Sequence, residues 1–150
     1  MGKNNVEEQH LDILVDTREQ KPLFKGTKIK LDEGDYNVPE LLDHIIIERK
    51  SPGDLYGSVI QGHVRFADEI NRAKLKGLKI YVVVECTEKD FYAKKWAGSY
   101  YTQLKGSILA KIICTMTHKY QINFVWCKNR AEAKQRIIDI IITNKKLYNK

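Results

Sequence analysis

Short apolar runs separated by polar bends occupy the first third of the chain. The run LDILVD breaks at TREQKP, as a buried strand breaks at a loop, and TKIKLD alternates as a half-exposed strand does. A bend at Glu33-Gly34-Asp35 interrupts this second strand. The β-branched run HIIIER has the length of a strand and ends at the breaker SPGD. We therefore expect strands at Leu11–Asp16, at Thr27–Asp32 with Tyr36–Val38 as its continuation, and at His44–Arg49.

Helical and strand-like periods alternate in the rest of the chain. After a cap at Ser51 or Asp54, apolar residues recur at helical spacing, with a gap at residues 62–63, and the pattern stops at Gly77. The last helical stretch becomes apolar almost all round over Ile137–Ile142. We expect helices over residues 51–76, Leu104–Met116 and 129–142, strands over Lys79–Cys86 and Ile122–Cys127, and a loop over Thr87–Ser99.

The alternation of strands and helices predicts the fold class. Strands separated by helices imply a partly parallel sheet with helices on both faces. No internal repeat or Gly/Ser/Pro linker divides the chain, and 43% hydrophobic residues among 150 can build one sizeable core. We therefore expect a polar lead over residues 1–10 and one α/β domain over residues 11–150, with a central mixed sheet flanked by helices.

Charge and cysteine content narrow the class of protein. A net charge of +7 permits a polyanionic partner such as nucleic acid, because basic side chains that neutralise phosphates release condensed counterions. The three cysteines lack CxxC-like spacing, and an odd number argues against a disulfide framework. The four histidines are scattered and show no zinc-ligand spacing.

The apolar runs also bear on the compartment. They are too short to cross a bilayer, and the N-terminus MGKNNVEEQH lacks the apolar region of a secretory signal. We therefore expect an intracellular, cytoplasmic protein with no membrane partner. The bias towards Lys, Asn and Ile is compositional and points to an AT-rich genome, that of a prokaryote or a virus.

The candidate chemistry lies in GDY at Gly34–Tyr36 and in IIIERK at Ile45–Lys50. In a hairpin of the two strands, Asp35 and Glu48 can converge at the same edge of the sheet. Two carboxylates on rigid backbone suit Mg²⁺ or Mn²⁺, which keep several waters and take phosphate oxygens as further ligands. Because side chains alternate along a strand, Glu48 and Lys50 point to one side and Arg49 points to the other.

Phosphodiester hydrolysis fits this set of groups. A divalent cation lowers the pKa of bound water, and a lysine beside it can orient or deprotonate the nucleophile or stabilise the charge of the phosphorane. Spacing does not decide between these roles for Lys50. Spacing alone also leaves open an exposed salt-bridge network at a strand end, since the chain is rich in lysine and glutamate.

Several separated motifs resemble the nuclease domain of the XPF/Mus81/Hef family, the ERCC4 domain. They are VDTREQ at Val15–Gln20, GDY, and ERKSPGDL at Glu48–Leu55, where Asp54 supplies the final aspartate of the family signature. SVIQGHVRFADEINR, KIYVVVE and YTQLKGSILAKI resemble the segments that follow in the family. The resemblance extends from about residue 11 to about residue 142 and implies a restriction-endonuclease-like fold of the PD-(D/E)xK type.

The resemblance also implies roles for residues of this chain. Asp35, Glu48 and the main-chain carbonyl of Arg49 would bind Mg²⁺ or Mn²⁺. Lys50 would be the catalytic lysine. Asp16 would lie near the metal, through a water molecule or at a second ion.

Other motif residues would support the site. Arg18 and Glu19 would complete its rim. Arg49 and Asp54 could serve either function or structure: Arg49 by pairing with a carboxylate, and Asp54 by capping the helix that follows. Many family members carry a helix-hairpin-helix domain after the nuclease; we expect none in this chain, so the choice of substrate stays open.

Features outside the motifs have two interpretations each. Arg65 and Arg72 could bind DNA phosphates near the cut or form a solvated helix face. Lys94–Trp96 and Tyr100-Tyr101 interleave basic and aromatic groups, which suits stacking of unpaired bases, although aromatics before an amphipathic helix more often pack onto the core. The all-round apolar Ile137–Ile142 needs cover on several faces, so we expect a homodimer or heterodimer through the C-terminal helices.

The residues and the resemblance together predict a structure-selective DNA endonuclease that cuts beside a flap, fork or other branch in repair or recombination. A non-catalytic DNA-binding or scaffolding subunit of the same fold is the alternative. The intact set of Asp35, Glu48 and Lys50 favours the enzyme, because a subunit without activity has no need of it.

Overall fold

The computed structural model describes residues 8, 10–60 and 63–148. Within these residues, six strands form one mixed sheet: β1 (Leu14–Asp16), β2 (Thr27–Ile29), β3 (Tyr36–Asn37), β4 (Ile45–Lys50), β5 (Lys79–Val84) and β6 (Asn123–Trp126). Their order across the sheet is β2-β1-β3-β4-β5-β6. β4, β5 and β6 are parallel, β1 and β2 are parallel, and the short β3 is antiparallel to both of its neighbours.

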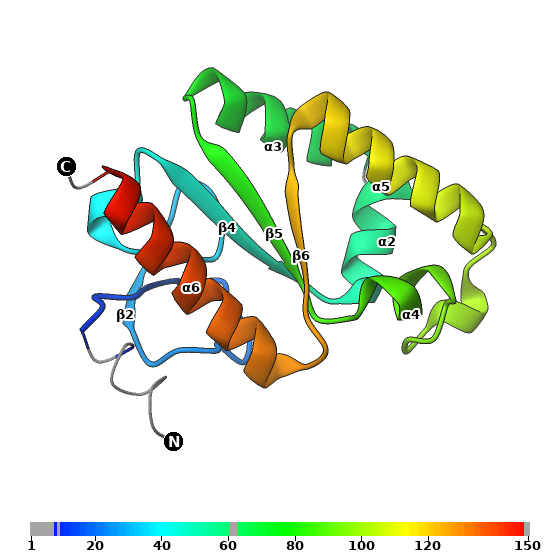
Figure 1. Ribbon diagram of the computed structural model, residues 1–150, viewed down its shortest axis with the longest axis horizontal. Coiled ribbons are helices and arrows are strands. Elements are labelled where there is room, and N and C mark those ends of the chain that lie inside the picture. The colour runs from blue at the N-terminus through cyan, green and yellow to red at the C-terminus, as the bar shows by residue number, and fades with distance from the viewer. Residues whose placement is uncertain (1–7, 9, 61–62, 149–150) are drawn as a thin grey trace.

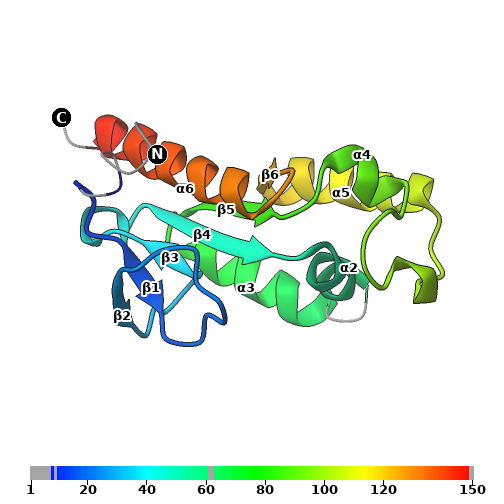
Figure 2. The same ribbon diagram turned by 90° about the horizontal axis from the view of Figure 1, so that it is seen from below.

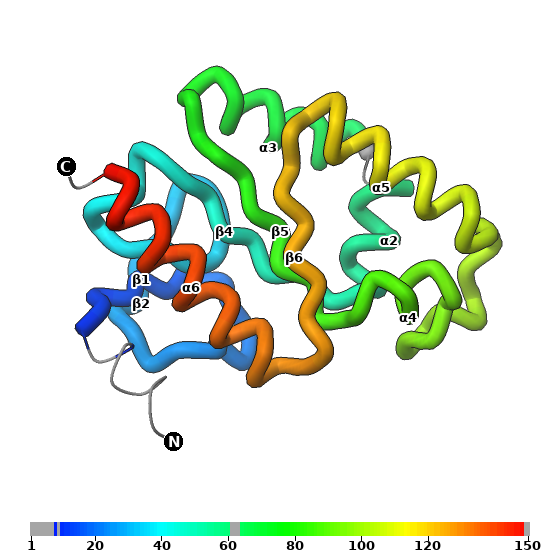
Figure 3. Tube along the Cα trace, in the orientation of Figure 1, coloured from blue at the N-terminus to red at the C-terminus, as the bar shows by residue number. Residues whose placement is uncertain are grey.

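Helices lie on both faces of this sheet (Figures 1 and 2). The described helical segments are η1 (Pro39–Leu41), α2 (Pro52–Ile60), α3 (His63–Leu75), α4 (Glu88–Tyr92), η2 (Ser99–Tyr101), α5 (Gly106–Tyr120) and α6 (Arg130–Tyr148). Figure 2 shows α6 on one face of β4, and α2 and α3 on the other. The chain trace in Figure 3 follows the same path. The mixed sheet flanked by helices confirms the predicted α/β class.

Alternate residues of β4 supply two separate hydrophobic cores. Ile46 belongs to the core that packs under α2, α3, α4 and α5. Ile45 and Ile47 belong to the core under α6, which also contains Val15 and Tyr36. β4 therefore lies at the centre of the molecule, and its C-terminal end is held by packing on both sides.

The apolar surface of α6 is covered within the chain. Ile137, Ile138 and Ile141 are fully buried in the core beneath α6, and Ile140 and Ile142 are partly buried against it. The cover that Ile137–Ile142 needs is thus supplied within the chain, by the core that α6 shares with β1, β3 and β4.

Residues 51–76 form two helices where the sequence predicts one. α2 and α3 pack against each other, and both direct apolar residues into the same core, Leu55 and Val59 from α2 and Phe66 and Ile70 from α3. The gap in the apolar pattern falls at the junction, and residues 61–62 lie outside the described residues. One straight helix over residues 51–76 would span about 39 Å, at 1.5 Å per residue, whereas two packed helices bring both sets of apolar residues onto the same core.

The predicted loop Thr87–Ser99 contains a short helix, α4, and its end begins η2. Thr87 caps α4 by accepting a hydrogen bond from the N–H of Asp90 (3.1 Å). Phe91 is fully buried, which ties the helix to the core. Thr87-x-x-Asp90 is a capping signal that a reading of hydrophobic period alone overlooks.

The other strands and helices are found close to their predicted positions, although their first and last residues differ from the prediction. The exception is the predicted continuation of one strand. Tyr36–Val38 does not continue the strand at Thr27–Asp32: β2 pairs with one side of β1, and β3 pairs with the other. The helix expected over Leu104–Met116 is α5 and ends at Tyr120. Among the described residues, no helix combines the length and the apolar character needed to cross a membrane.

Candidate active site

A glycine bend places Asp35 at the start of β3. Gly34 has φ +80°, and a Cβ atom there would lie 2.9 Å from the carbonyl oxygen of Ile47 and 2.9 Å from a methyl group of Ile46. The backbone then fixes Asp35, whose N–H donates to the carbonyl of Ile47 (2.8 Å) and whose carbonyl accepts from the N–H of Asp16 (2.9 Å). Only glycine allows both the positive φ and the close approach to β4.

The hairpin of β3 and β4 brings the predicted catalytic residues together. The N–H of Arg49 donates to Asp35 Oδ2 at 2.7 Å. On the same strand, Lys50 Nζ lies 3.6 Å from Glu48 Oε1, and the two side chains are 12% and 23% exposed. Glu48 and Lys50 thus share one side of β4, as strand alternation predicts.

The two carboxylates are held where their charge is disfavoured. Burial raises the pKa of Asp35 to about 7, with Glu48 and Glu19 adding to the rise while the N–H of Arg49 opposes it. Burial also raises the pKa of Glu48; the ion pair with Lys50 opposes this, and Glu69 adds to it. A nearby cation would relieve both effects, so this pair of oxygen donors fits Mg²⁺ or Mn²⁺.

The number of donors limits what this site can do alone. In the described part of the chain, no three His, Cys, Asp or Glu side chains gather as a preformed metal cluster. Mg²⁺ bound by one or two carboxylates keeps several waters and takes phosphate oxygens, so two carboxylates are sufficient for such a site. The main-chain carbonyl of Arg49 as a further ligand stays a prediction.

Lys50 lines a groove between α2 and α3. Its ammonium group is 5.5 Å from the ring centroid of Phe66. The groove is lined by Lys50, Gly53, Asp54, Gly57, Ser58, Arg65, Phe66 and Glu69. Of the two predicted DNA-binding arginines, Arg65 lines the same groove as Lys50.

Arg72 has different surroundings. Its Nε lies 3.5 Å from Glu33 Oε1, which Lys76 also approaches at 3.6 Å. Arg72 is thus committed to a carboxylate on the β2–β3 connection, and its exposed position still leaves phosphate binding as a prediction.

Arg49 faces the other side of β4 and is surrounded by acceptors. Its Nε donates to Glu85, and its Nη1 donates to Glu19 (3.2 Å) and to the carbonyl of Lys21 (3.0 Å). The hydroxyl of Tyr36 also donates to Glu19. Burial disfavours the charged guanidinium, but the bonds to Glu85 and Glu19 raise the pKa of Arg49 above its usual value. Arg49 and Glu19 therefore fasten the loop after β1 to the ends of β4 and β5.

Asp16 is paired within its own loop. Its carboxylate, 2% exposed, accepts hydrogen bonds from the backbone and guanidinium of Arg18 and from the N–H of Leu31. Burial acts to raise the pKa of Asp16, but these hydrogen bonds hold it below its ordinary value. Both oxygens are occupied, unlike those of Asp35 and Glu48, so in this structure Asp16 and Arg18 form a clamp on the backbone.

Ser51, and not Asp54, caps α2. Ser51 Oγ accepts from the N–H of Asp54 at 3.1 Å. Asp54 is exposed in the first turn of the helix, where it lies between the Lys50 groove and a hollow that Arg49 lines. A carboxylate in the first turn is favoured by the helix dipole, which supports a structural role for Asp54; a role in the chemistry stays a prediction.

Comparison with known proteins decides the family. A model of the ERCC4 domain matches residues 6–138, which is most of the chain. This chain belongs to the ERCC4 domain family. ERCC4 domains are typical of structure-specific DNA nucleases, which generally depend on divalent metals. No curated protein matches the chain.

Solved structures support the same fold. Two structures of XPF from Aeropyrum pernix, one of them a complex with DNA, are each 19% identical to this chain, with a TM-score of 0.67. They cover 91% and 90% of this chain, which spans 66% and 67% of theirs. The ERCC4 domain described here therefore has the restriction-endonuclease-like fold that the resemblance implied.

Three glutamates near the ERCC4 motif are absent from the set that the sequence predicts. Glu85 pairs with Arg49, and Glu33 and Glu69 raise the pKa of Glu48. The sequence could have indicated Glu85, because this carboxylate directly follows the buried strand β5, at the strand end where site residues are expected. Glu69 comes from α3, and no local pattern in the sequence predicts that its side chain approaches Glu48.

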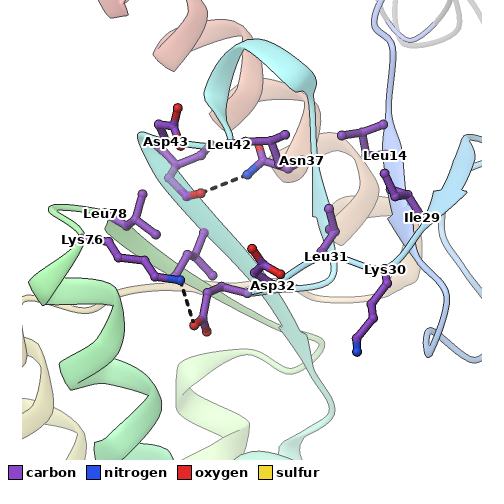
Figure 4. Close-up of a pocket in the computed structure, with 13 residues that line it drawn as sticks. Leu14, Ile29, Lys30, Leu31, Asp32, Asn37, Leu42, Asp43, Lys76 and Leu78 are labelled. Carbon is purple, nitrogen blue, oxygen red and sulfur yellow. Dashed lines mark hydrogen bonds and ion pairs between the residues drawn. The ribbon is translucent and has the colours of Figure 1, made fainter.

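A second hollow, drawn in Figure 4, lies beside the site on the open face of β1 and β3. Its volume is about 470 Å³, and it shares Glu33 and Ile46 with the recess over Glu48. Seven apolar and six polar or charged residues line it, and two of the apolar ones, Ile29 and Leu42, are exposed. None of the predicted catalytic residues lines it.

The aromatic residues before α5 divide between the two interpretations. Trp96 packs against the core, as expected for aromatics before an amphipathic helix. Tyr100 and Tyr101 do not: their exposed fractions are 90% and 86%. For the tyrosines the prediction of core packing is wrong, because η2 carries them beyond α2, at the far right of Figure 1.

Proposed function

We propose that this ERCC4 domain is a Mg²⁺- or Mn²⁺-dependent DNA endonuclease that cuts beside a flap, fork or other branch, in repair or recombination. The observation that carries the proposal is the pair of buried carboxylates, Asp35 and Glu48, with Lys50 ion-paired to Glu48 at the mouth of a groove. Charges that burial disfavours, and that the chain leaves incompletely paired, are typical of a functional site.

The residues divide the work of hydrolysis between them. Asp35 and Glu48 would hold the cation, which supplies Lewis-acid stabilisation and a more acidic water when bound. Lys50 would act on the nucleophile or on the negative charge of the phosphate, and Arg65 would hold the DNA backbone along the groove. The bend at Gly34 keeps Asp35 in place for this without help from substrate.

Two variants of Lys50 separate its possible roles. Lys50→Ala removes both proton transfer and charge, whereas Lys50→Arg keeps the charge and loses the base at accessible pH. Cleavage retained in Lys50→Arg supports charge stabilisation; cleavage lost equally in both supports proton transfer.

The test of the enzyme itself is cleavage of labelled fork, flap, four-way and linear DNA in Mg²⁺ or Mn²⁺. Asp35→Asn and Lys50→Ala should abolish cutting while DNA binding is kept, and Asp43→Asn, an exposed carboxylate at the other end of β4, is the matched control. Wild-type protein that binds branched DNA and cuts none of it would favour the alternative, a non-catalytic DNA-binding or scaffolding subunit.

Dimerisation through the C-terminal helices stays a prediction. The apolar segment Ile137–Ile142 no longer supports it, because that segment packs on the core of the same chain. Two other apolar side chains on these helices, Ile108 on α5 and Leu147 on α6, are 42% and 51% exposed. Light scattering after size-exclusion chromatography at micromolar concentration tests it, and a monomer there would contradict a dimer of this chain.

A further inference from the structure

The positive charge of the chain is concentrated in one segment. Residues 91–131 contain seven lysines and arginines and no aspartate or glutamate, whereas the rest of the chain has nineteen basic and nineteen acidic residues. The net charge of +7 is therefore that of this segment. It includes η2, α5 and β6, and we call it the acid-free segment.

The lysines of the acid-free segment lie on the surface. Lys95, Lys105, Lys111, Lys119 and Lys128 are exposed. Among the described residues, none of the five forms an ion pair with a carboxylate. Elsewhere lysines do pair, as Lys76 does with Glu33. The charges of these five lysines are thus free to bind a polyanion.

The acid-free segment also carries two exposed tyrosines. The rings of Tyr100 and Tyr101 meet edge to face, with centroids 5.5 Å apart, and both are almost fully exposed. Hydrogen bonds fix the backbone beneath them: Ser99 Oγ donates to the carbonyl of Lys94 (2.5 Å), and Lys94 Nζ donates to the carbonyl of Thr102 (2.9 Å). The ordered backbone holds both rings in solvent, so their exposure does not come from an unsupported loop.

The tyrosine pair is joined to the active-site end of the sheet through Trp96. Its indole stacks on Phe91 and lies near Tyr56 of α2, with ring centroids 5.9 and 6.0 Å apart. A Cβ atom at Gly53 would lie 3.9 Å from the Trp96 ring, and Gly53 also lines the groove that holds Lys50. In Figures 1 and 2, α2 follows the end of β4, and the segment that contains η2 lies on the far side of α2 from the sheet.

We propose that the acid-free segment, with Tyr100 and Tyr101, binds an unpaired DNA strand next to the site of cleavage. Lysines would follow the phosphates, and the tyrosines would stack on bases. A base inside a duplex is covered on both faces by its neighbours, so only an unpaired base offers a free face to these rings. The proposal rests on the proposed function and adds to it the part of the branched substrate that this surface takes.

Binding of fluorescein-labelled dT20 and of a 20-bp duplex, followed by anisotropy in EDTA, tests the proposal without metal or cleavage. The double variant Tyr100→Ala/Tyr101→Ala should bind dT20 about tenfold more weakly or worse. Its affinity for the duplex should stay within about twofold, since no base stacks there. Tyr100→Phe/Tyr101→Phe keeps the rings and should bind dT20 as the wild type does.

A lysine pair tests the electrostatic half. Lys105→Gln/Lys111→Gln should lower the slope of log affinity for dT20 against log salt by about 0.7 for each phosphate that the variant no longer neutralises. The control Lys28→Gln/Lys30→Gln, at the opposite edge of the sheet, removes the same charge from another surface and should leave affinity for dT20 closer to that of the wild type.

Three results overturn the proposal. They are unchanged binding of dT20 by the alanine variant, equal decreases in affinity for dT20 and duplex, and a change of molecular mass in the alanine variant, which would make the tyrosines a protein interface. Thermal melting verifies that the variants fold. If the protein binds dT20 as expected but cuts no DNA, the strand-binding proposal stands and the nuclease proposal fails. If the protein cuts branched DNA but the alanine variant binds dT20 as the wild type does, the nuclease proposal stands and the strand-binding proposal fails.

Discussion

Arg49 and Lys50 are neighbours on β4, yet they point to opposite sides and meet opposite surroundings. Arg49 has two carboxylates and two carbonyl oxygens around its guanidinium. Lys50 has one carboxylate at 3.6 Å and a groove in front of it. The carboxylates differ in the same way, because Glu85 and Glu19 are paired to a cation that cannot leave, whereas burial raises the pKa of both Asp35 and Glu48.

This difference separates a structural network, around Arg49, from the candidate catalytic site, around Lys50, within the tripeptide Glu48–Lys50. The Arg49 side joins the loop after β1 to two strand ends, and its charges are satisfied by the chain itself. The Lys50 side keeps charges in a partly desolvated place without full compensation, which is typical of a functional site. The hydrogen bonds of Arg49 to Glu19 and Glu85 support its structural interpretation, and a role at the metal stays a prediction.

The largest expected effect lies on the Lys50 side. Glu48→Gln should reduce cleavage at least about a hundredfold, because it removes metal stabilisation worth several kcal/mol in the transition state. The melting temperature should be unchanged or higher, since an uncharged amide is easier to bury. Single-turnover cleavage and calorimetry measure the two effects, and cleavage within threefold of wild type would remove Glu48 from the site.

On the Arg49 side the effect should appear in stability. Arg49→Met leaves Glu19 and Glu85 without their cation and should cost about 3–5 kcal/mol of unfolding free energy. Urea denaturation measures it, with the exposed Arg65→Met as a control that should stay within about 0.5 kcal/mol. Equal stabilities for the two variants would show that the Arg49 network contributes nothing.

The pH dependence of stability distinguishes Asp35 from the paired acids. Its pKa is raised to about 7 from 3.8, so the folded protein holds a proton that the unfolded chain releases. Stability from this group is complete below pH 3.8 and is lost as pH rises through 7. In EDTA, the unfolding free energy of Asp35→Asn minus that of the wild type should therefore increase by on the order of 2–4 kcal/mol as pH rises from 5 to 8. A constant difference between the two melting curves over that range would contradict this.

The smallest expected effect concerns the start of α2. Ser51→Ala removes the hydrogen bond to the N–H of Asp54 and should cost about 1 kcal/mol, whereas Asp54→Asn keeps the cap and should cost less. Chemical denaturation of both variants decides between Ser51 and Asp54 as the cap. A larger decrease in stability for Asp54→Asn would reverse the assignment.

Local signals in the sequence are sufficient for the strands, for most helices and for the grouping of the candidate catalytic residues. Gly34 marks a bend, the alternation along ERK separates Lys50 from Arg49, and the period of α5 is regular. These depend on residues close together in the chain, where steric rules are strong.

What the sequence could not predict depends on packing between distant segments. The pairing of Arg49 with Glu85, the approach of Glu69 to Glu48 and the burial of α6 all follow from how helices pack on the sheet. The division between α2 and α3 has no clear signal, because the apolar period resumes after its gap. No clear signal in the sequence predicts the exposure of Tyr100 either. Trp96, four residues earlier, packs against the core, and the sequence does not say which of the two aromatic residues does so.

The central position of β4 has a consequence for amide hydrogen exchange. β4 is bonded to β3 and β5, and its isoleucines belong to both cores. No partial opening that keeps one core intact can free it, so its amides should exchange with solvent only when the whole domain unfolds. Glu48 and Lys50, the predicted catalytic residues of β4, should thus lie in the last part of the molecule to open.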